Sequence, residues 1–213
     1  MTRRDDLLIH RPAAPGVATE LLLLFHGVGS SAEDLRPLGQ MLAERRPQAW
    51  VVSVRSPDAS DLGQGWQWFS VQGVTEANRP ARVAAAMPRF VEAVQDWQRE
   101  IGVAPSGTVL VGFSQGAIMA LESTQQPEPP AGRVVALAGR FAQAPHAAPA
   151  GLQLHLLHGD DDRVMPVTLA RDAAARWHAL GGSATLDTFP GLGHGIDERV
   201  VRKVAEHLGA AAS

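Results

Sequence analysis

The sequence predicts a single α/β domain, in which helices cover both faces of a mostly parallel central sheet. Apolar segments of strand length alternate with longer segments of helical period over the whole chain. Such alternation is typical of parallel sheets with right-handed crossovers. Most of the strand segments are continuously apolar, which is expected of strands that are buried on both faces.

The predicted elements follow one another with short joints that are rich in proline and glycine. A first strand is expected at 7–9, and the other strands at 20–26, 50–54, 108–113, 133–137, 152–158 and 184–189. Helices are expected at 32–46, 80–101, 115–123, 167–180 and 196–208, and in 80–101 apolar residues three or four positions apart form one stripe. Since no joint has the length or composition of an interdomain linker, we expect one domain over residues 1–213.

Composition excludes several classes of protein. The chain of 213 residues has no cysteine, which excludes a thiol nucleophile, a disulfide framework and thiolate metal ligands. It carries 19 Lys and Arg against 22 Asp and Glu, so it has no basic surface for nucleic acid. The longest wholly aliphatic and aromatic run, 21–25, is far shorter than the roughly 20 residues that cross a bilayer. We therefore expect neither a nucleic-acid partner nor stable membrane association.

The N-terminus carries no clear targeting signal. Residues 1–4 (MTRR) could begin a twin-arginine signal, but Asp5 and Asp6 follow at once, without an apolar stretch of signal length. We expect a short solvated tail and a cytoplasmic protein.

A candidate nucleophile lies in the pentapeptide 112–116 (GFSQG), which fits G-x-S-x-G. An apolar strand precedes it and a helix-forming segment follows, so a sharp turn would raise the Ser114 hydroxyl above the carboxyl edge of the sheet. The flanking glycines let the strand and helix approach each other. A glycine-rich turn that holds a serine by chance is the alternative, and the strand–turn–helix setting favours the nucleophile.

A serine nucleophile needs a positioned base and an orienting acid, which follow it in the order acid, then histidine. Of the six histidines after Ser114, only His194 lies in a short glycine-flanked loop after a strand. The loop 159–166 (GDDDRVMP) offers three aspartates as the acid. We choose Asp162 because it lies nearest the point where the loop must turn back over the sheet, although the spacing leaves Asp160 and Asp161 open.

Acyl transfer also requires two backbone N–H groups that stabilise the oxyanion. We expect one from Gln115, the residue after the nucleophile, and the other from Val28 in the early glycine-rich loop 26–29 (HGVG). His26 precedes the nucleophile in the chain, and we expect it to make structural hydrogen bonds.

Two further groups of residues could form a binding site. His155 and His158 with the aspartates could form a metal site, but residues three apart on a strand point to opposite faces, and we expect neither a metal nor a cofactor. Trp66, Trp68 and Phe69 stand close together in a chain with 5% aromatic residues. We take them as candidates for lining an acyl pocket; the alternative is that they cap the core beneath a long loop.

Four motifs together resemble the phospholipase/carboxylesterase family of α/β-hydrolases, which includes the acyl-protein thioesterases, and are most similar to its small bacterial serine esterases. They are LLFHGVG at 23–29, GFSQGAIMAL at 112–121, HGDDDRVMP at 158–166 and GH at 193–194, and the likeness covers residues 20–208. The resemblance implies an α/β-hydrolase fold and an acid four residues after the equivalent of His158, which is Asp162. Ser70 departs from the aspartate that is common in the family after a Trp-Phe pair.

These observations predict a serine hydrolase that cleaves carboxylic esters or thioesters through an acyl-enzyme on Ser114. Its partner would be a small-molecule ester or thioester, or an acylated protein. A catalytically silent α/β-hydrolase scaffold that serves as a small-molecule receptor is the alternative. The presence of all three triad residues favours the enzyme.

Overall fold

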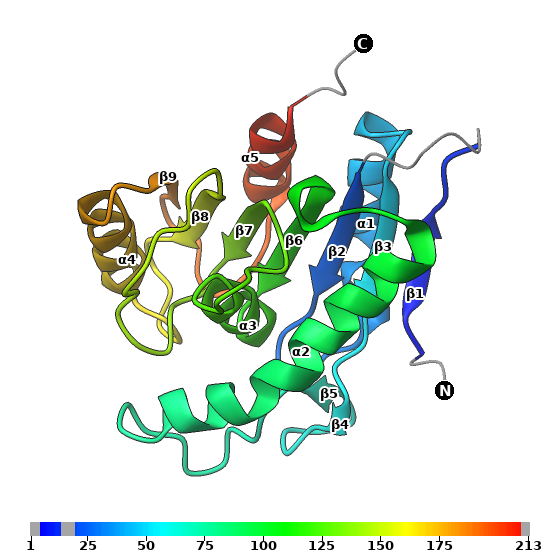
Figure 1. Cartoon of the computed structure of the whole chain (residues 1–213). Helices are drawn as coiled ribbons and strands as arrows, with labels where there is room; N and C mark the ends of the chain where they lie inside the picture. The colour runs from blue at the N-terminus through cyan, green and yellow to red at the C-terminus, as the bar shows by residue number, and fades with distance from the viewer. Residues whose placement is uncertain (1–4, 14–19, 210–213) are drawn as a thin grey trace.

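A computed structural model describes residues 5–13 and 20–209, which are arranged around one seven-stranded sheet (Figure 1). The solvated tail expected at residues 1–4 lies outside the described residues. The strands take the order β1-β3-β2-β6-β7-β8-β9, and every neighbouring pair is parallel except β1 with β3. Their bounds are β1 Leu7–His10, β2 Leu21–Phe25, β3 Trp50–Val54, β6 Thr108–Phe113, β7 Arg133–Leu137, β8 Gln153–Gly159 and β9 Ser183–Phe189.

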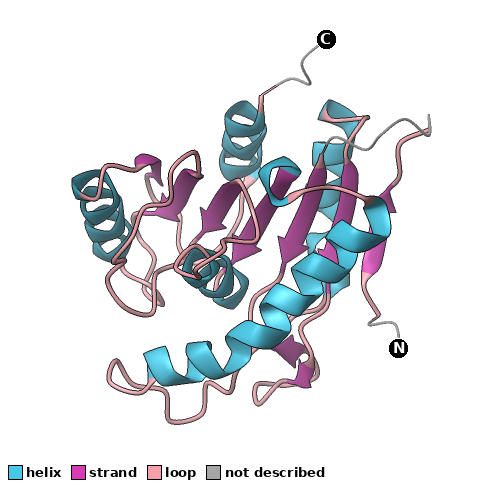
Figure 2. Cartoon of the chain, in the orientation of Figure 1, coloured by secondary structure: helices cyan, strands magenta, loops and turns pink. Residues whose placement is uncertain are grey.

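Helices cover both faces of this sheet (Figure 2). Helices α2, α3 and α4 pack into the core on one face, and α1 and α5 into the core on the other. The bounds are α1 Arg36–Arg45, α2 Arg79–Ile101, α3 Gln115–Ser123, α4 Val167–Ala179 and α5 Glu198–Leu208, with short 3₁₀ helices η1 Ala32–Leu35 and η2 Pro105–Gly107. The α/β fold with a mostly parallel sheet is confirmed. Among the described residues, each helix is too short or too polar to cross a membrane.

Strand β2 shows why the apolar runs are continuous. All five of its residues are buried, and they alternate between the two cores. Leu21, Leu23 and Phe25 face α2 and α3, whereas Leu22 and Leu24 face α1 and α5. Full burial of one such side chain stabilises a fold by about 1.5–3 kcal/mol, so the strand is held by both layers of helices.

The predicted elements differ from the structure mainly at their ends and in one joint. The helix expected at 32–46 divides at Leu35 into η1 and α1, and Pro37 stands in the first turn of α1. Helix α5 begins at Glu198 because the Asp197 carboxylate accepts hydrogen bonds from the first N–H groups of the helix. A small hairpin, β4 Asp58–Ala59 with β5 Trp66–Gln67, was not predicted, since two-residue strands show no periodicity.

The strand order reverses between β2 and β6. After β2, the chain adds β3 on one side of it, and then adds β6, β7, β8 and β9 in order on the other side. Ligands of open α/β sheets bind at such a reversal of strand order. Phe25 is in register with Gly112, so the residues that follow these two strands become neighbours.

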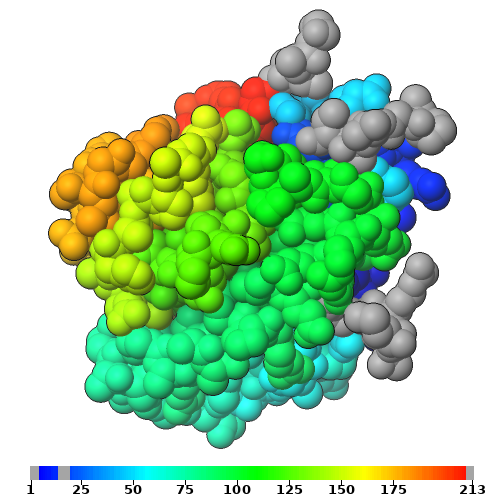
Figure 3. Space-filling model, viewed as in Figure 1, coloured from blue at the N-terminus to red at the C-terminus, as the bar shows by residue number. Residues whose placement is uncertain are grey.

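Two loops at this edge contact each other. In Figure 3 the teal segment that leads into α2 lies against the yellow-green segment that follows β7. A 2.7 Å ion pair between Glu76 and Arg140 joins them. Glu76 also pairs with Arg79 at the start of α2, so one carboxylate links both loops to that helix.

Candidate active site

Ser114 stands on a strained turn between β6 and α3. Its φ of 53° and ψ of −114° put a non-glycine residue in a conformation that costs about 1–3 kcal/mol, which the surroundings must stabilise. Glycines make the turn possible: a Cβ on Gly112 would lie 2.5 Å from the Gly116 carbonyl oxygen, and one on Gly116 would lie 2.2 Å from that of Phe25. The turn is held by a 3.0 Å hydrogen bond from the Ser114 N–H to the Leu137 carbonyl.

His194 lies within hydrogen-bonding distance of this hydroxyl. It follows β9 and occupies the centre of a three-residue turn, in which the Gly195 N–H donates to the Gly193 carbonyl at 3.0 Å. His194 Nε2 is 2.9 Å from Ser114 Oγ, and the imidazole packs against the Phe113 ring at 5.2 Å between centroids. The ring is partly exposed, so a substrate can reach the face of the site that it borders.

Asp162 holds the other nitrogen of the imidazole. Its Oδ2 accepts a 2.7 Å hydrogen bond from His194 Nδ1, while Oδ1 accepts from the N–H groups of Val164 and Met165 at 2.8 and 2.9 Å. Burial by itself raises the pKa of Asp162, but the hydrogen bonds from His194 and the two amides outweigh it, and the pKa lies below its ordinary value. The carboxylate is therefore ionised at neutral pH.

The other two aspartates of this loop have different contacts. Asp160 Oδ1 accepts a 2.7 Å hydrogen bond from the Gly191 N–H, and the Asp161 N–H donates to the Leu192 carbonyl at 3.0 Å with its side chain exposed. These bonds tie the loop after β8 to the loop after β9. Of the three aspartates that the sequence left open, Asp162 is the one whose carboxylate meets His194.

His158 is a member of the site that the sequence analysis missed. It is buried at the end of β8, and its Nε2 lies 2.7 Å from the Met165 carbonyl and 3.3 Å from Asp162 Oδ2. Because a carbonyl only accepts, Nε2 carries the proton. Its position four residues before Asp162 is the sequence feature that could have identified it.

His155 lies apart from these residues. Its Nδ1 is 2.8 Å from Thr185 Oγ1, and its ring stacks on His207 of α5 at 4.3 Å. Burial, with the nearby charges of His207 and Arg133, lowers the pKa of His155 to about 4. The part of the chain that the structure describes holds no group of three or more His, Asp or Glu residues that could bind a metal.

The glycine-rich turn after β2 lies beside the nucleophile. A Cβ on Gly27 would be 3.2 Å from the Ser114 Cβ, so this turn and the serine are in direct contact. Within the described residues, the N–H groups of Val28 and Gln115 donate to no other protein group, and Gln115 is the first residue of α3, where helical N–H groups lack partners. Both amides are thus available to an anion.

His26 makes structural contacts below this turn. Its Nε2 accepts hydrogen bonds from the N–H and the hydroxyl of Ser56, both at 3.1 Å, so Nδ1 bears the proton and donates to the Gly27 carbonyl at 2.8 Å. Burial lowers the pKa of His26, which keeps the ring neutral. Both ring nitrogens are thus used in hydrogen bonds that fix the turn, and neither is free to contact a substrate.

The structure corrects the expected aromatic pocket. Trp68 and Phe69 are only 2% and 7% exposed and belong to the core, where Trp68 meets the Phe90 ring edge-on at 5.0 Å. Membership of the core was the alternative interpretation for these two residues. Trp66 is half-buried, and the Arg55 guanidinium lies 3.7 Å above its ring.

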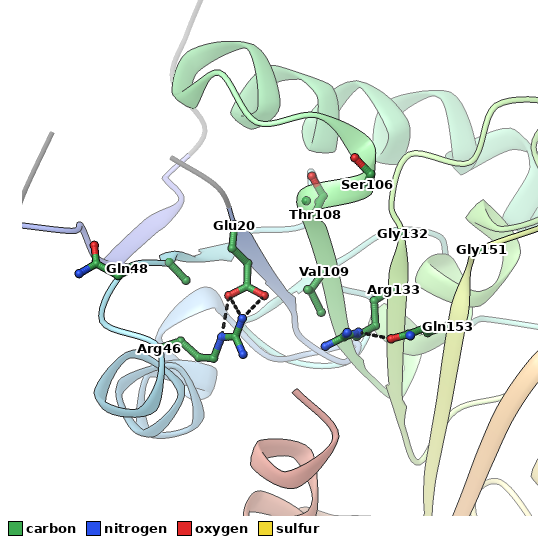
Figure 4. A pocket seen from close by; sticks show the side chains of 12 residues that line it. Glu20, Arg46, Gln48, Ser106, Thr108, Val109, Gly132, Arg133, Gly151 and Gln153 are labelled. Atoms are coloured by element: carbon green, nitrogen blue, oxygen red, sulfur yellow. Dashed lines mark hydrogen bonds and ion pairs between the residues drawn. The ribbon is translucent and has the colours of Figure 1, made fainter. Parts of the chain in front are cut away.

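A cavity of about 490 Å³ lies at the opposite end of the strands (Figure 4). It is bordered by the starts of β6, β7 and β8, and the Arg46–Glu20 ion pair of 2.6 Å points into it. Since Ser114, Asp162 and His194 all follow the carboxyl ends of strands, this cavity is separate from them.

Comparisons with known proteins agree on one family. The family model described as phospholipase/carboxylesterase matches residues 8–212. The chain is 44% identical over 206 residues to "Esterase YpfH" of Escherichia coli K12, covering 97% of this chain and 88% of that one. The crystal structure of esterase PE8 superposes with a TM-score of 0.84 at 30% identity, covering 96% of each chain. The Bacillus cereus carboxylesterase shares the fold, with a TM-score of 0.80 at 18% identity over 97% of this chain and 93% of that one.

Proposed function

The chain belongs to the phospholipase/carboxylesterase family and is an esterase, and we propose that it cleaves carboxylic esters through an acyl-enzyme on Ser114. The observation that carries the proposal is the continuous chain of hydrogen bonds from Asp162 through His194 to Ser114, at 2.7 and 2.9 Å. Three residues that are 32 and 80 positions apart in the sequence meet at one edge of the sheet.

Acylation follows from the roles that these atoms can take. The Ser114 hydroxyl attacks the acyl carbon while His194 Nε2 accepts its proton, and the Asp162 carboxylate stabilises the imidazolium. The N–H groups of Val28 and Gln115 donate to the oxyanion of the tetrahedral intermediate. The intermediate collapses when His194 returns the proton to the leaving alcohol, which leaves the acyl group on Ser114.

Deacylation repeats these steps with water. His194 Nε2 takes a proton from the water as it attacks the acyl carbon, and returns it to Ser114 Oγ as the acid departs. Every proton transfer uses the His194 ring and every developing charge meets a described group, so the proposed reaction needs no cofactor.

The proposed substrate is a small-molecule carboxylic ester, and the same chemistry would cleave a thioester or deacylate an acylated protein. A series of acyl esters and acyl thioesters of increasing chain length distinguishes these substrates. We also propose a cytoplasmic location and one catalytic domain over the whole chain.

The test of the proposed function is Ser114→Ala. In this variant the rate of p-nitrophenyl butyrate hydrolysis should fall by at least about 10³-fold. The circular dichroism spectrum should be unchanged, because the methyl group fits the same turn. Ser70→Ala, which removes an exposed hydroxyl, is the matched control and should keep wild-type activity. An undiminished rate in folded Ser114→Ala would overturn the assignment of the nucleophile.

A further inference from the structure

The side chain of Gln115 makes two hydrogen bonds that the reaction does not use directly. Gln115 is buried, with 2% of its surface exposed, at the first position of α3. Its Oε1 accepts from the Trp68 N–H at 2.7 Å, and its Nε2 donates to the Phe69 carbonyl at 2.8 Å. A primary amide satisfies this donor and acceptor together, which neither a carboxylate nor an apolar side chain of the same size can do.

The segment 66–69 that Gln115 holds is itself bonded to the glycine-rich turn after β2. The Gly29 N–H donates to the Trp66 carbonyl at 3.0 Å, and the Trp66 N–H donates to the Ser30 carbonyl at 2.8 Å. The contact is also close, because a Cβ on Gly65 would lie 2.2 Å from the Gly29 backbone. Thus the position of Val28, one residue before Gly29, depends on the position of the segment 66–69.

We propose that the Gln115 carboxamide is a positioning residue for the oxyanion site, a role that rests on the proposed function. The backbone N–H of Gln115 supplies one donor, and its side chain, acting through the segment 66–69, sets the position of the Val28 donor. One residue therefore fixes both amides relative to Ser114. A buried backbone N–H or C=O that loses its hydrogen-bond partner costs free energy. The bonds to Trp68 and Phe69 therefore keep this arrangement rigid.

The expected signature is a loss of transition-state stabilisation with little change in substrate binding. Gln115→Met keeps the length of the side chain and removes both hydrogen bonds. We expect kcat to fall by about 10- to 100-fold, which is less than the loss of a whole oxyanion donor, and KM to stay within about twofold. Binding of a boronic acid, which forms a tetrahedral adduct with the serine, should weaken by a similar factor.

Gln98 provides a matched control for a buried glutamine that is only structural. It is 8% exposed, and its Nε2 donates to Thr108 Oγ1 at 2.8 Å and to the Pro130 carbonyl at 2.7 Å. Thr108 begins β6, whereas Ser114 follows its other end. Gln98→Met and Gln115→Met should both lower the melting temperature, but Gln98→Met should keep wild-type kcat and boronic acid affinity. Equal kcat losses in the two variants would overturn the proposal.

A second variant keeps the test decisive if Gln115→Met does not fold. Gly65→Ala leaves Gln115 intact and pushes directly on the Gly29 backbone. It should reproduce the fall in kcat with unchanged KM, and a wild-type kcat in folded Gly65→Ala would count against the proposal. Labelling of the wild-type enzyme by a fluorophosphonate distinguishes a failure of the proposed function from a failure of the positioning role. If Ser114 is not labelled, the proposed function fails; if it is labelled and folded Gln115→Met has wild-type kcat, only the positioning role fails.

Discussion

Replacing Asp162 by asparagine should move the proton of the neutral His194 ring from Nδ1 to Nε2. Oδ1 of Asp162 accepts two backbone hydrogen bonds, from Val164 and Met165. An asparagine must place its carbonyl oxygen there, because an NH₂ group would face two donors. The NH₂ group then faces His194 Nδ1, which must become an acceptor. His194 would carry its proton on Nε2, facing Ser114, and could no longer accept the serine proton.

The size of this effect follows from the tautomer. In serine hydrolases of this mechanism, the same substitution lowers kcat by about 10⁴-fold, which corresponds to about 5 kcal/mol in activation free energy. Since the asparagine keeps the shape of Asp162 and its two backbone hydrogen bonds, we expect only a small change in the free energy of unfolding. The loss should therefore appear in kcat and not in the folded fraction.

The assay is steady-state hydrolysis of p-nitrophenyl butyrate at neutral pH, with circular dichroism as the check on folding. Asp161→Asn is the matched control, because the side chain of Asp161 is exposed and only its backbone N–H makes a bond in this loop. It should keep kcat within about twofold of wild type, as expected for a surface substitution. A folded Asp162→Asn variant that keeps more than about a tenth of wild-type kcat would refute the proposed orientation of His194.

Three further changes test other contacts. The folded-state pKa of His155, about 4, lies below its ordinary 6.5, so the unfolded chain binds more protons as pH falls. Urea titrations should show wild type losing about 2 kcal/mol more unfolding free energy than His155→Gln between neutral pH and about pH 5, and equal losses would contradict this. A Cβ in Gly159→Ala would lie 2.1 Å from the Leu192 carbonyl and displace the loop that carries the base; kcat should fall at least about tenfold, and a wild-type value would count against that geometry. His158→Leu removes the donor to the Met165 carbonyl and should cost about 1–3 kcal/mol in urea unfolding, whereas unchanged stability would show that the bond is dispensable.

The sheet could be predicted because its signals are local. A run such as Leu21–Phe25 is apolar at every position, and only a strand covered on both faces buries all five side chains. The turn at Ser114 could also be predicted from the sequence, because its glycines stand where a Cβ would collide with neighbouring backbone. Chain order then restricted the base to the residues that follow.

The acid and the aromatic residues depended on contacts that the local sequence does not specify. Asp160, Asp161 and Asp162 are chemically identical neighbours, and they differ only in which one faces the loop after β9. Trp68 could not be assigned to pocket or core, because it follows a two-residue strand and its backbone N–H bonds to Gln115, 47 positions away. The bond between Gln115 and Phe69 spans 46 positions, and no spacing rule connects them.

The most direct test of the central claim is a rapid-quench experiment on the acyl-enzyme. Enzyme mixed with p-nitrophenyl acetate is quenched with acid in the pre-steady state, digested and mapped by mass spectrometry. We predict a p-nitrophenol burst of about one equivalent per chain and an acetyl group on the peptide that contains Ser114. Turnover with the acetyl group on a different residue, or with Ser114 unmodified throughout the burst, would contradict the proposed mechanism.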